Sequence, residues 1–211
     1  MSSAPRIEAA AERSGLVRDA LSLAREAHAG QLRNTGSDEL PFIGHPVAVA
    51  EHLSREGFED EVVAAGLLHD VVEHTDVTLE EVRDRFGEEV AQLVGVLTES
   101  EAIGSYEARK EEHRARVASA GPEAHAVFTA DKTANVETLR AAYAVRGEEV
   151  DAELPVSLDV KIFVWELDLE MLFRAAPELP LVDRFADEMA KLWGQRATWS
   201  RDGLDGDGTH P

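Results

Sequence analysis

The sequence predicts an all-α protein, and three observations lead to this prediction. Apolar residues recur at i, i+3 and i+4 spacing along runs rich in Ala, Leu, Glu and Arg, which is the pattern of amphipathic helices. Runs in which apolar and polar residues alternate, as in half-buried strands, are nearly absent. Glycine, proline and capping residues separate the periodic segments.

The periodic segments are the expected helices. In chain order they cover residues 6–28, 46–56, 59–72, 79–86, 87–100, 105–120, 122–146, 156–175 and 180–196. The stretch NTGSDELP at 34–41 carries turn residues and is expected to be a loop. Residues 199–211 are rich in Gly and Asp, so we expect a disordered tail after a single domain over residues 1–198.

Local signals set the ends of several expected helices. Pro46 opens the second helix, because proline suits the first helical turn and restricts the residue before it. The periodic pattern stops at Gly57 and again at Gly87. Thr78 followed by Glu81 is a capping-box signature, which predicts the start of the fourth helix.

The composition limits the classes of function. The chain has 42 acidic and 21 basic residues and a formal net charge of −21, which disfavours nucleic acids and anionic membranes as partners. It has no run of eighteen apolar residues and no charged-then-apolar leader, so we expect a soluble, cytoplasmic protein. Cysteine is absent, so any metal must be held by His, Asp and Glu.

The stretch LLHDVVEHTDVTLEE at 67–81 has His69 and Asp70 in the middle of an apolar run. A helix that buries this run carries a carboxylate into the core, which costs several kcal/mol unless a partner compensates it. His45 at a helix start and Asp131 after another apolar run are further metal-capable groups. Taken singly, His45 also fits a helix cap, and Asp131 also fits an ion pair with Lys132.

A shell of two His and two Asp from three helices fits one metal ion between those helices. Mixed nitrogen and oxygen ligands without sulfur suit Mn²⁺, Fe²⁺, Zn²⁺ or Co²⁺ better than a calcium cage. Read in order as H…HD…D, these residues resemble the signature of the HD-superfamily metal-dependent phosphohydrolases, which are helical bundles. More of the chain, about residues 15–195, is similar to one branch, the hydrolase domain of RelA/SpoT-type proteins and small alarmone hydrolases. The segments that carry this likeness are AHAGQLRNTG at 27–36, PFIGHPVAVAEHL at 41–53, AGLLHDVVEHTDVTLEEVRDRFGEEVAQLV at 65–94 and ADKTANVETL at 130–139.

The resemblance implies a divalent metal and a catalytic pair. The metal is expected to be Mn²⁺, with Fe²⁺, Zn²⁺, Co²⁺ and Mg²⁺ as alternatives, and its implied ligands are His45, His69, Asp70 and Asp131. Glu73 matches the first member of the family's Glu-Asp pair, and His74 stands where the Asp is expected. Glu73 is expected to take the proton of an attacking water. His74 either hydrogen-bonds a phosphate as a cation, transfers protons as a neutral base, or is a solvent-facing residue at a helix end.

The resemblance also implies a nucleotide pocket. Arg33 matches an arginine that packs on a guanine base, and Asn135 and Thr138 match residues that line the pocket. Lys132 is a further candidate cation for a polyanionic substrate. The remaining basic residues at 109–116 are expected to pair on the surface of their own Glu-rich helix. The residues expected to be structural or surface residues are His28, His52, His113, His125, Trp165 and Trp193.

The expected function is hydrolysis of a small phosphorylated nucleotide, such as the 3′-diphosphate of (p)ppGpp. Three alternatives remain open from the sequence. One is the same chemistry on another nucleotide, such as a nucleoside monophosphate or NADPH. Another is a module that senses a nucleotide without cleaving it. The last is a metal-free helical interaction protein.

Overall fold

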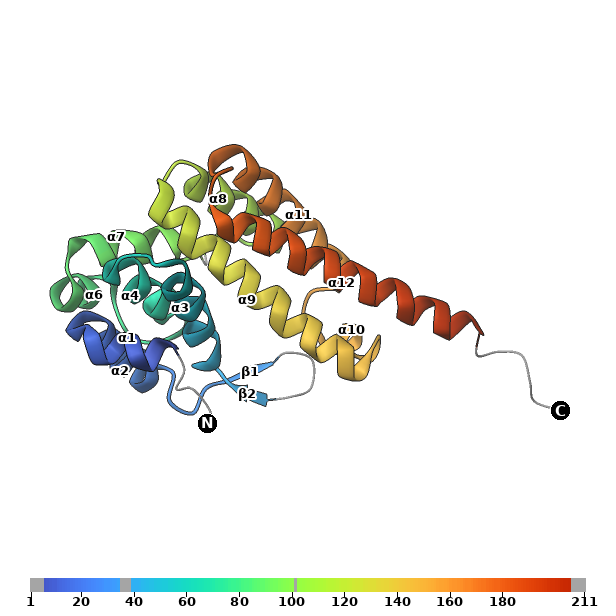
Figure 1. Cartoon of the computed structure of the whole chain (residues 1–211), viewed down its shortest axis with the longest axis horizontal. Coiled ribbons are helices and arrows are strands. Elements are labelled where there is room, and N and C mark those ends of the chain that lie inside the picture. The colour runs from blue at the N-terminus through green and yellow to red at the C-terminus, as the bar shows by residue number, and fades with distance from the viewer. Residues whose placement is uncertain (1–5, 35–38, 101, 206–211) are drawn as a thin grey trace.

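A computed structural model of the chain describes residues 6–34, 39–100 and 102–205, which form an almost entirely helical fold (Figure 1). The predicted all-α class is confirmed, and no described helix is both long and apolar enough to cross a membrane. Two short strands, β1 (Leu32–Asn34) and β2 (Glu39–Pro41), pair antiparallel. The helices are α1 (Arg6–Arg13), α2 (Gly15–Ala27), α3 (Gly44–Glu56), α4 (Asp60–Leu68), α5 (Val71–His74), α6 (Leu79–Phe86), α7 (Glu88–Leu97), α8 (Tyr106–Ala118), α9 (Pro122–Arg146), α10 (Glu149–Glu153), α11 (Leu158–Ala175) and α12 (Pro180–Asp205).

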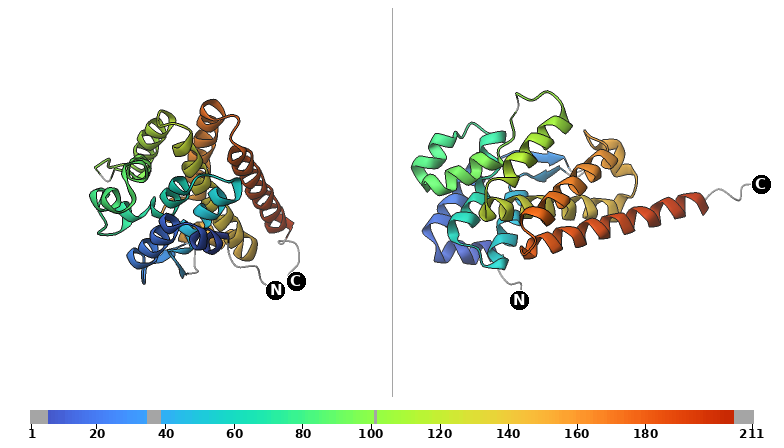
Figure 2. Two further views of the ribbon diagram at one scale, coloured as in Figure 1. Left: turned by 60° about the vertical axis from the view of Figure 1, so that its left-hand side comes forward. Right: turned by 90° about the horizontal axis from the view of Figure 1, so that it is seen from above.

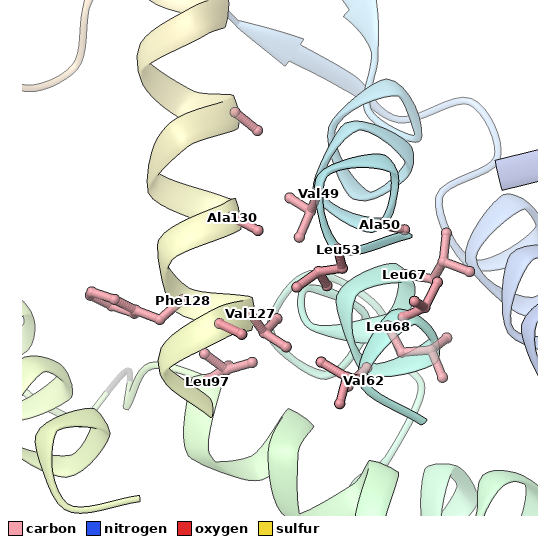
Figure 3. Packing of buried hydrophobic residues seen from close by; sticks show 14 of the residues in the cluster. Val49, Ala50, Leu53, Val62, Leu67, Leu68, Leu97, Val127, Phe128 and Ala130 are labelled. Atoms are coloured by element: carbon pink, nitrogen blue, oxygen red, sulfur yellow. The ribbon is translucent and has the colours of Figure 1, made fainter. Parts of the chain in front are cut away.

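Helix α9 is the central element of the fold. It packs against α3, α4, α7, α8, α11 and α12, so it is covered on several sides at once. Figure 3 shows Val49 and Leu53 of α3 and Val127 and Ala130 of α9 directed into the space between the two helices. All four side chains are fully buried. A polar residue in the middle of α9 is therefore held in a dry environment by its own helix.

The helix predicted over residues 6–28 is divided into α1 and α2. Ser14 takes an extended backbone conformation, with φ −122° and ψ 121°, and its side chain accepts a hydrogen bond from the Val17 amide at 3.3 Å. This cap starts a new helix instead of continuing the first one. The predicted cap at Thr78 is present, because its hydroxyl accepts from the Glu81 amide at 3.2 Å.

The helix predicted over residues 59–72 also ends early, which corrects the expectation that the His-Asp doublet lies inside a helix. Helix α4 ends at Leu68, and His69 and Asp70 form the turn before α5. The His69 Nδ1–H donates to the Gly66 carbonyl at 2.9 Å. In a continuous helix that carbonyl accepts from the amide of residue 70. The side chain therefore takes the place of a main-chain partner at the break.

The β-hairpin was not predicted, because residues 34–41 were expected to be a loop. Arg33 pairs with Leu40 in its register, and the Phe42 amide donates to the Gln31 carbonyl at 3.0 Å beyond the strands. Three-residue strands are too short for an alternating pattern to show in the sequence. Helix α10 is too short to have been read from periodicity as well.

The C-terminal helix differs from the expected disordered tail. Helix α12 begins at Pro180 as predicted but continues to Asp205, and its last turns project beyond the rest of the fold (Figures 1 and 2). No proline follows within the helix to stop it, and a single helical glycine costs only about 1 kcal/mol. The remainder of the predicted tail, residues 206–211, lies outside the described residues.

A substitution at Gly66 of α4 tests the close contact between α3 and α4. A Cβ atom at this position would lie 2.5 Å from Cδ1 of Leu53, which is fully buried and has little room to move. We expect Gly66→Ala to lower the free energy of unfolding by about 1–3 kcal/mol, measured by urea denaturation. The control is Gly194→Ala in α12, where a Cβ meets no atom within 4 Å. Equal stability of Gly66→Ala and the wild type would contradict the packing described.

Candidate functional site

The four predicted metal ligands converge at one point between α3, the α4–α5 break and α9. The His45 Nε2 lies 3.0 Å from Asp131 Oδ1 and 3.6 Å from Asp70 Oδ2. The His69 Nε2 lies 3.2 Å from Asp70 Oδ1 and 3.8 Å from Asp131 Oδ1. The structure thus brings together side chains that are up to 86 residues apart in the sequence.

The local structure explains why these side chains meet. His45 lies in the first turn of α3, where its amide donates to the Phe42 carbonyl at 3.0 Å. His69 and Asp70 follow α4 with right-handed helical backbone angles, and His69 Nε2 lies 3.2 Å from Asp70 Oδ1. Asp131 lies in the buried middle of α9, between Ala130 and Lys132, both of which are buried.

The electrostatics of the site keep both carboxylates ionised. Burial by itself would raise the pKa of Asp131, but Lys132 and His45 hold that pKa well below its usual value. Burial acts in the same way on Asp70, and His69 and His45 outweigh it, so the pKa of Asp70 is also lowered. Burial lowers the pKa of His45, which favours the neutral, ligand-competent imidazole. The donor set is therefore anionic oxygen together with neutral nitrogen.

The orientation of His69 shows that this set fits a divalent cation. Because its Nδ1–H donates to Gly66, Nε2 is the ring nitrogen left for a ligand, and that atom is buried without a hydrogen-bond partner. It lies 3.2 Å from Asp70 Oδ1, so an imidazole nitrogen and a carboxylate oxygen face the same point. One ligand atom each from His45, His69 and Asp131 lie within 4.8 Å of one another, and Asp70 flanks both imidazoles.

Three of the predicted substrate-binding residues are connected to Asp131. Lys132 Nζ lies 2.9 Å from Asp131 Oδ2 and 4.5 Å from the centre of the Phe128 ring. Figure 3 shows Phe128 on the other side of α9 from Val127. The Asn135 side chain donates to Asp131 Oδ1 at 2.7 Å, and Arg33 Nη2 donates to Asn135 Oδ1 at 2.5 Å. Both oxygens of Asp131 therefore have partners that fix the orientation of the carboxylate.

A cavity of about 200 Å³ opens above the four converging side chains, and Arg33, Lys132 and Asn135 line it. Thr138 does not line this cavity. It lines an adjoining chamber of about 110 Å³, which shares Arg33 and Asn135 with the main cavity. The Thr138 hydroxyl donates to the carbonyl of Ala134 one turn earlier, at 2.8 Å.

Glu73 and His74, the predicted catalytic pair, also line the main cavity. Glu73 Oε2 accepts a hydrogen bond from the Glu99 amide at 3.0 Å. Burial raises the pKa of Glu73, and this hydrogen bond opposes the rise only in part. His74 lies at the rim, where its Nε2 is 3.8 Å from Glu73 Oε1 and its ring meets the edge of Phe42.

Four further residues, Glu99, Lys110, Lys161 and Trp165, line the cavity. The sequence analysis did not single out Glu99 or Lys161. Lys110 of α8 pairs with Glu99 across elements, which corrects the expectation of pairs within its own helix. The signal that was available for Lys161 and Trp165 is their i,i+4 spacing, because it puts both on one face of a helix.

Of two other basic residues of α8, one pairs with a different helix and one pairs within α8. Arg114 Nε lies 2.7 Å from Oδ1 of the buried Asp168 of α11, again across elements. Arg116 forms the predicted i,i+4 pair, with Glu112 at 3.2 Å. Trp193, expected to be packed, is 45% exposed. Among the residues expected to be structural, the buried ones are His28, His52, His113, His125 and Trp165.

Comparison with known proteins gives consistent matches. A family model described as an HD domain matches residues 20–154. The guanosine-3′,5′-bis(diphosphate) 3′-pyrophosphohydrolase of Aquifex aeolicus is 36% identical over 125 residues, which are 58% of this chain and 18% of that protein. The GTP pyrophosphokinase of Streptomyces coelicolor is 30% identical over 203 residues, which are 92% of this chain and 23% of that protein. The chain thus spans about a fifth of the length of these relatives.

Two solved structures share the fold. A crystal structure of a Listeria monocytogenes EGD-e protein superposes with a TM-score of 0.66 at 33% identity, and the match covers 71% of this chain and 99% of that one. A metazoan ortholog of SpoT, described as hydrolysing ppGpp, superposes with a TM-score of 0.61 at 24% identity, over 90% of this chain and 96% of that one.

Asp131→Asn tests the metal centre directly. The amide keeps the shape of the side chain but removes one anionic ligand, so we expect retention of a divalent cation to fall by at least about tenfold. Elemental analysis of dialysed protein gives the metal content, and circular dichroism checks the fold. The control, Asp19→Asn, removes a charge from an exposed side chain and should leave the metal content unchanged. Equal metal content in Asp131→Asn and the wild type would contradict a ligand role for Asp131.

Proposed function

The chain belongs to the HD domain family, and on this basis we propose that it is a metal-dependent phosphohydrolase acting on a phosphorylated nucleotide. The observation that carries the proposal is the convergence of two imidazoles and two ionised carboxylates in a buried site that opens into a polar cavity. The name of the Aquifex aeolicus relative makes guanosine-3′,5′-bis(diphosphate), ppGpp, the first substrate to test.

We propose Mn²⁺ as the metal, held by His45, His69, Asp70 and Asp131. Two imidazole nitrogens with carboxylate oxygens and no sulfur support Mn²⁺, and the same donors also accept Fe²⁺, Co²⁺ or Zn²⁺. When bound, the cation supplies a Lewis acid that polarises a phosphoryl oxygen and makes water easier to deprotonate near neutral pH. Lys132 and Asn135 hold the Asp131 carboxylate in position, and we assign Lys132 to this role rather than to substrate contact.

Glu73 is the proposed general base. Its carboxylate lines the cavity beside the site, and its raised pKa brings it closer to the value at which a carboxylate accepts protons well. Water would attack the phosphorus of the 3′-diphosphate while Glu73 takes its proton. The bond between that phosphorus and the ribose 3′-oxygen breaks, and the 3′-oxygen takes a proton from solvent, so that the products are pyrophosphate and GDP.

The other cavity residues have proposed roles in binding. His74 at the rim, with its Nε2 3.8 Å from Glu73, donates a hydrogen bond to a phosphoryl oxygen. Arg33 packs against the base, as its guanidinium already lies 5.9 Å from the centre of the Phe42 ring. Asn135 and Thr138 contact the nucleoside in the adjoining chamber.

A substrate panel tests the function. We expect Mn²⁺-dependent release of pyrophosphate from ppGpp, detected by coupled assay, and no comparable release of orthophosphate from nucleoside monophosphates or NADPH. Release of orthophosphate from these nucleotides with ppGpp left intact would move the activity to another substrate. Binding of ppGpp without product at any metal would indicate a sensing module instead.

Glu73→Gln tests the general base. Because glutamine cannot accept the proton, we expect kcat to fall by about 10²- to 10⁴-fold while the metal content stays unchanged. The control is Glu80→Gln, an exposed glutamate in the first turn of α6. Steady-state kinetics on the substrate identified by the panel gives the comparison. A kcat within twofold of the wild type would exclude Glu73 as the base.

A further inference from the structure

The main-chain amide of Glu99 is available to Glu73 because helix α7 ends just before it. Thr98 leaves the helical conformation with φ −70° and ψ 122°, and its amide and hydroxyl both donate to the Val94 carbonyl at 2.9 Å. In a continuing helix the amide of Glu99 would donate to the carbonyl of Gly95. It donates instead to Glu73 Oε2 at 3.0 Å. The orientation of the Glu73 carboxylate therefore depends on where residue 99 lies.

The Gly95 carbonyl, which does not receive the Glu99 amide, is bonded by helix α8. Arg116 Nη1 donates to this carbonyl at 3.2 Å. Arg116 is itself held by Glu112, one turn earlier on α8, at 3.2 Å. Helix α8 thus compensates the end of α7 for the hydrogen bond that the Glu99 amide gives to Glu73.

The Glu99 side chain is fixed by the same helix. Lys110 pairs with its carboxylate, His113 Nδ1 lies 3.4 Å from Oε1, and Arg109 Nε lies 3.9 Å from Oε2. Burial by itself would raise the pKa of Glu99, but His113, Lys110 and Lys132 hold that pKa well below its usual value. The side chain is 12% exposed, so the carboxylate is ionised and largely buried.

A ring contact connects this ion cluster to α9. His113 meets the edge of the Phe128 ring, with the ring centres 5.3 Å apart. Lys132, which holds Asp131, lies over the same ring. Phe128 and His113 are both buried. The segment that orients Glu73 and the helix that carries Asp131 are therefore held in a fixed relation to each other.

We propose that Glu99 is a positioning residue for Glu73, and the inference rests on the proposed function for the role of Glu73 as the base. The Glu99 carboxylate, held by Lys110 and His113, fixes the amide that orients Oε2 of Glu73. The other oxygen, Oε1, is then the one that takes the proton of the attacking water. Glu99 also lines the cavity, but its negative charge repels a phosphorylated nucleotide, so it does not bind the substrate itself.

This role predicts a loss of kcat without a loss of substrate affinity. A misplaced base slows the chemical step, whereas removing an anion from the cavity does not weaken the binding of an anionic substrate. In steady-state kinetics on the substrate that the panel identifies, we expect Glu99→Ala to lower kcat by about 10- to 100-fold while KM stays the same or falls. Glu99→Gln keeps an oxygen that accepts from Lys110 and His113, so its kcat should stay within about tenfold of the wild type and above that of Glu99→Ala.

Glu188 of α12 provides a matched control. It is a buried glutamate held by Arg140 of α9 at 2.7 Å and by Lys191 at 2.6 Å, and it does not line the main cavity. Glu188→Ala removes a comparable ion cluster and should leave kcat within about twofold of the wild type. An equal loss in Glu99→Ala and Glu188→Ala, or a raised KM with kcat unchanged in Glu99→Ala, would overturn the positioning role.

Amide hydrogen exchange followed by NMR tests the contact without catalysis. The amide of residue 99 should be protected in the wild type, and Glu99→Ala should lower its protection by about tenfold or more, because alanine keeps the amide and loses the ion cluster. Glu188→Ala should leave this amide protected. Fast exchange of the amide in the wild type, or full protection in Glu99→Ala, would overturn the inference. If the amide behaves as expected but no nucleotide of the panel is cleaved, the proposed function fails while the orientation of Glu73 by Glu99 stands.

Discussion

The placement of two ionised and largely buried carboxylates beside two buried imidazoles is the constraint on which the rest of the structure depends. Charges of this kind are costly away from water, and Lys132 compensates only one of them, Asp131. A divalent cation completes the balance, which explains why α9 carries Asp131 through the middle of the fold. It also explains why His69 and Asp70 lie together at the junction of α4 and α5, where both side chains reach the same site.

The same constraint organises the wider cavity. The chain repels anions at long range because of its net charge, yet Arg33, Lys110 and Lys161 gather around one opening. Lys110 is held by Glu99, whose amide in turn holds Glu73, so the charge network and the proposed base are connected. The cavity wall thus brings four basic side chains, including Lys132, together with acidic ones, and a bound divalent cation would add the positive charge that a small polyanion needs.

The fold class could be predicted from local patterns, and the convergence of His45, His69, Asp70 and Asp131 could be predicted from their order in the sequence and its resemblance to a known family. Periodicity predicted the long helices, and α9 runs from residue 122 to residue 146 as predicted. The capping box at Thr78 predicted the start of α6, and the Thr78 hydroxyl forms that cap. The division at Ser14 and the break at His69 could not be read, since each depends on a side chain that competes for a main-chain group. The pairing of Lys110 with Glu99 and of Arg114 with Asp168 depends on packing between distant elements, which periodicity does not encode.

The metal centre is tested most directly by X-ray diffraction from crystals of the metal-loaded protein, recorded at the absorption edge of the bound metal. The anomalous map should show one strong peak per chain, about 2.0–2.2 Å from the Nε2 atoms of His45 and His69 and from carboxylate oxygens of Asp70 and Asp131. A map without a peak among these four side chains, from crystals of protein that retains metal in solution, would contradict the metal centre and the hydrolytic function proposed from it.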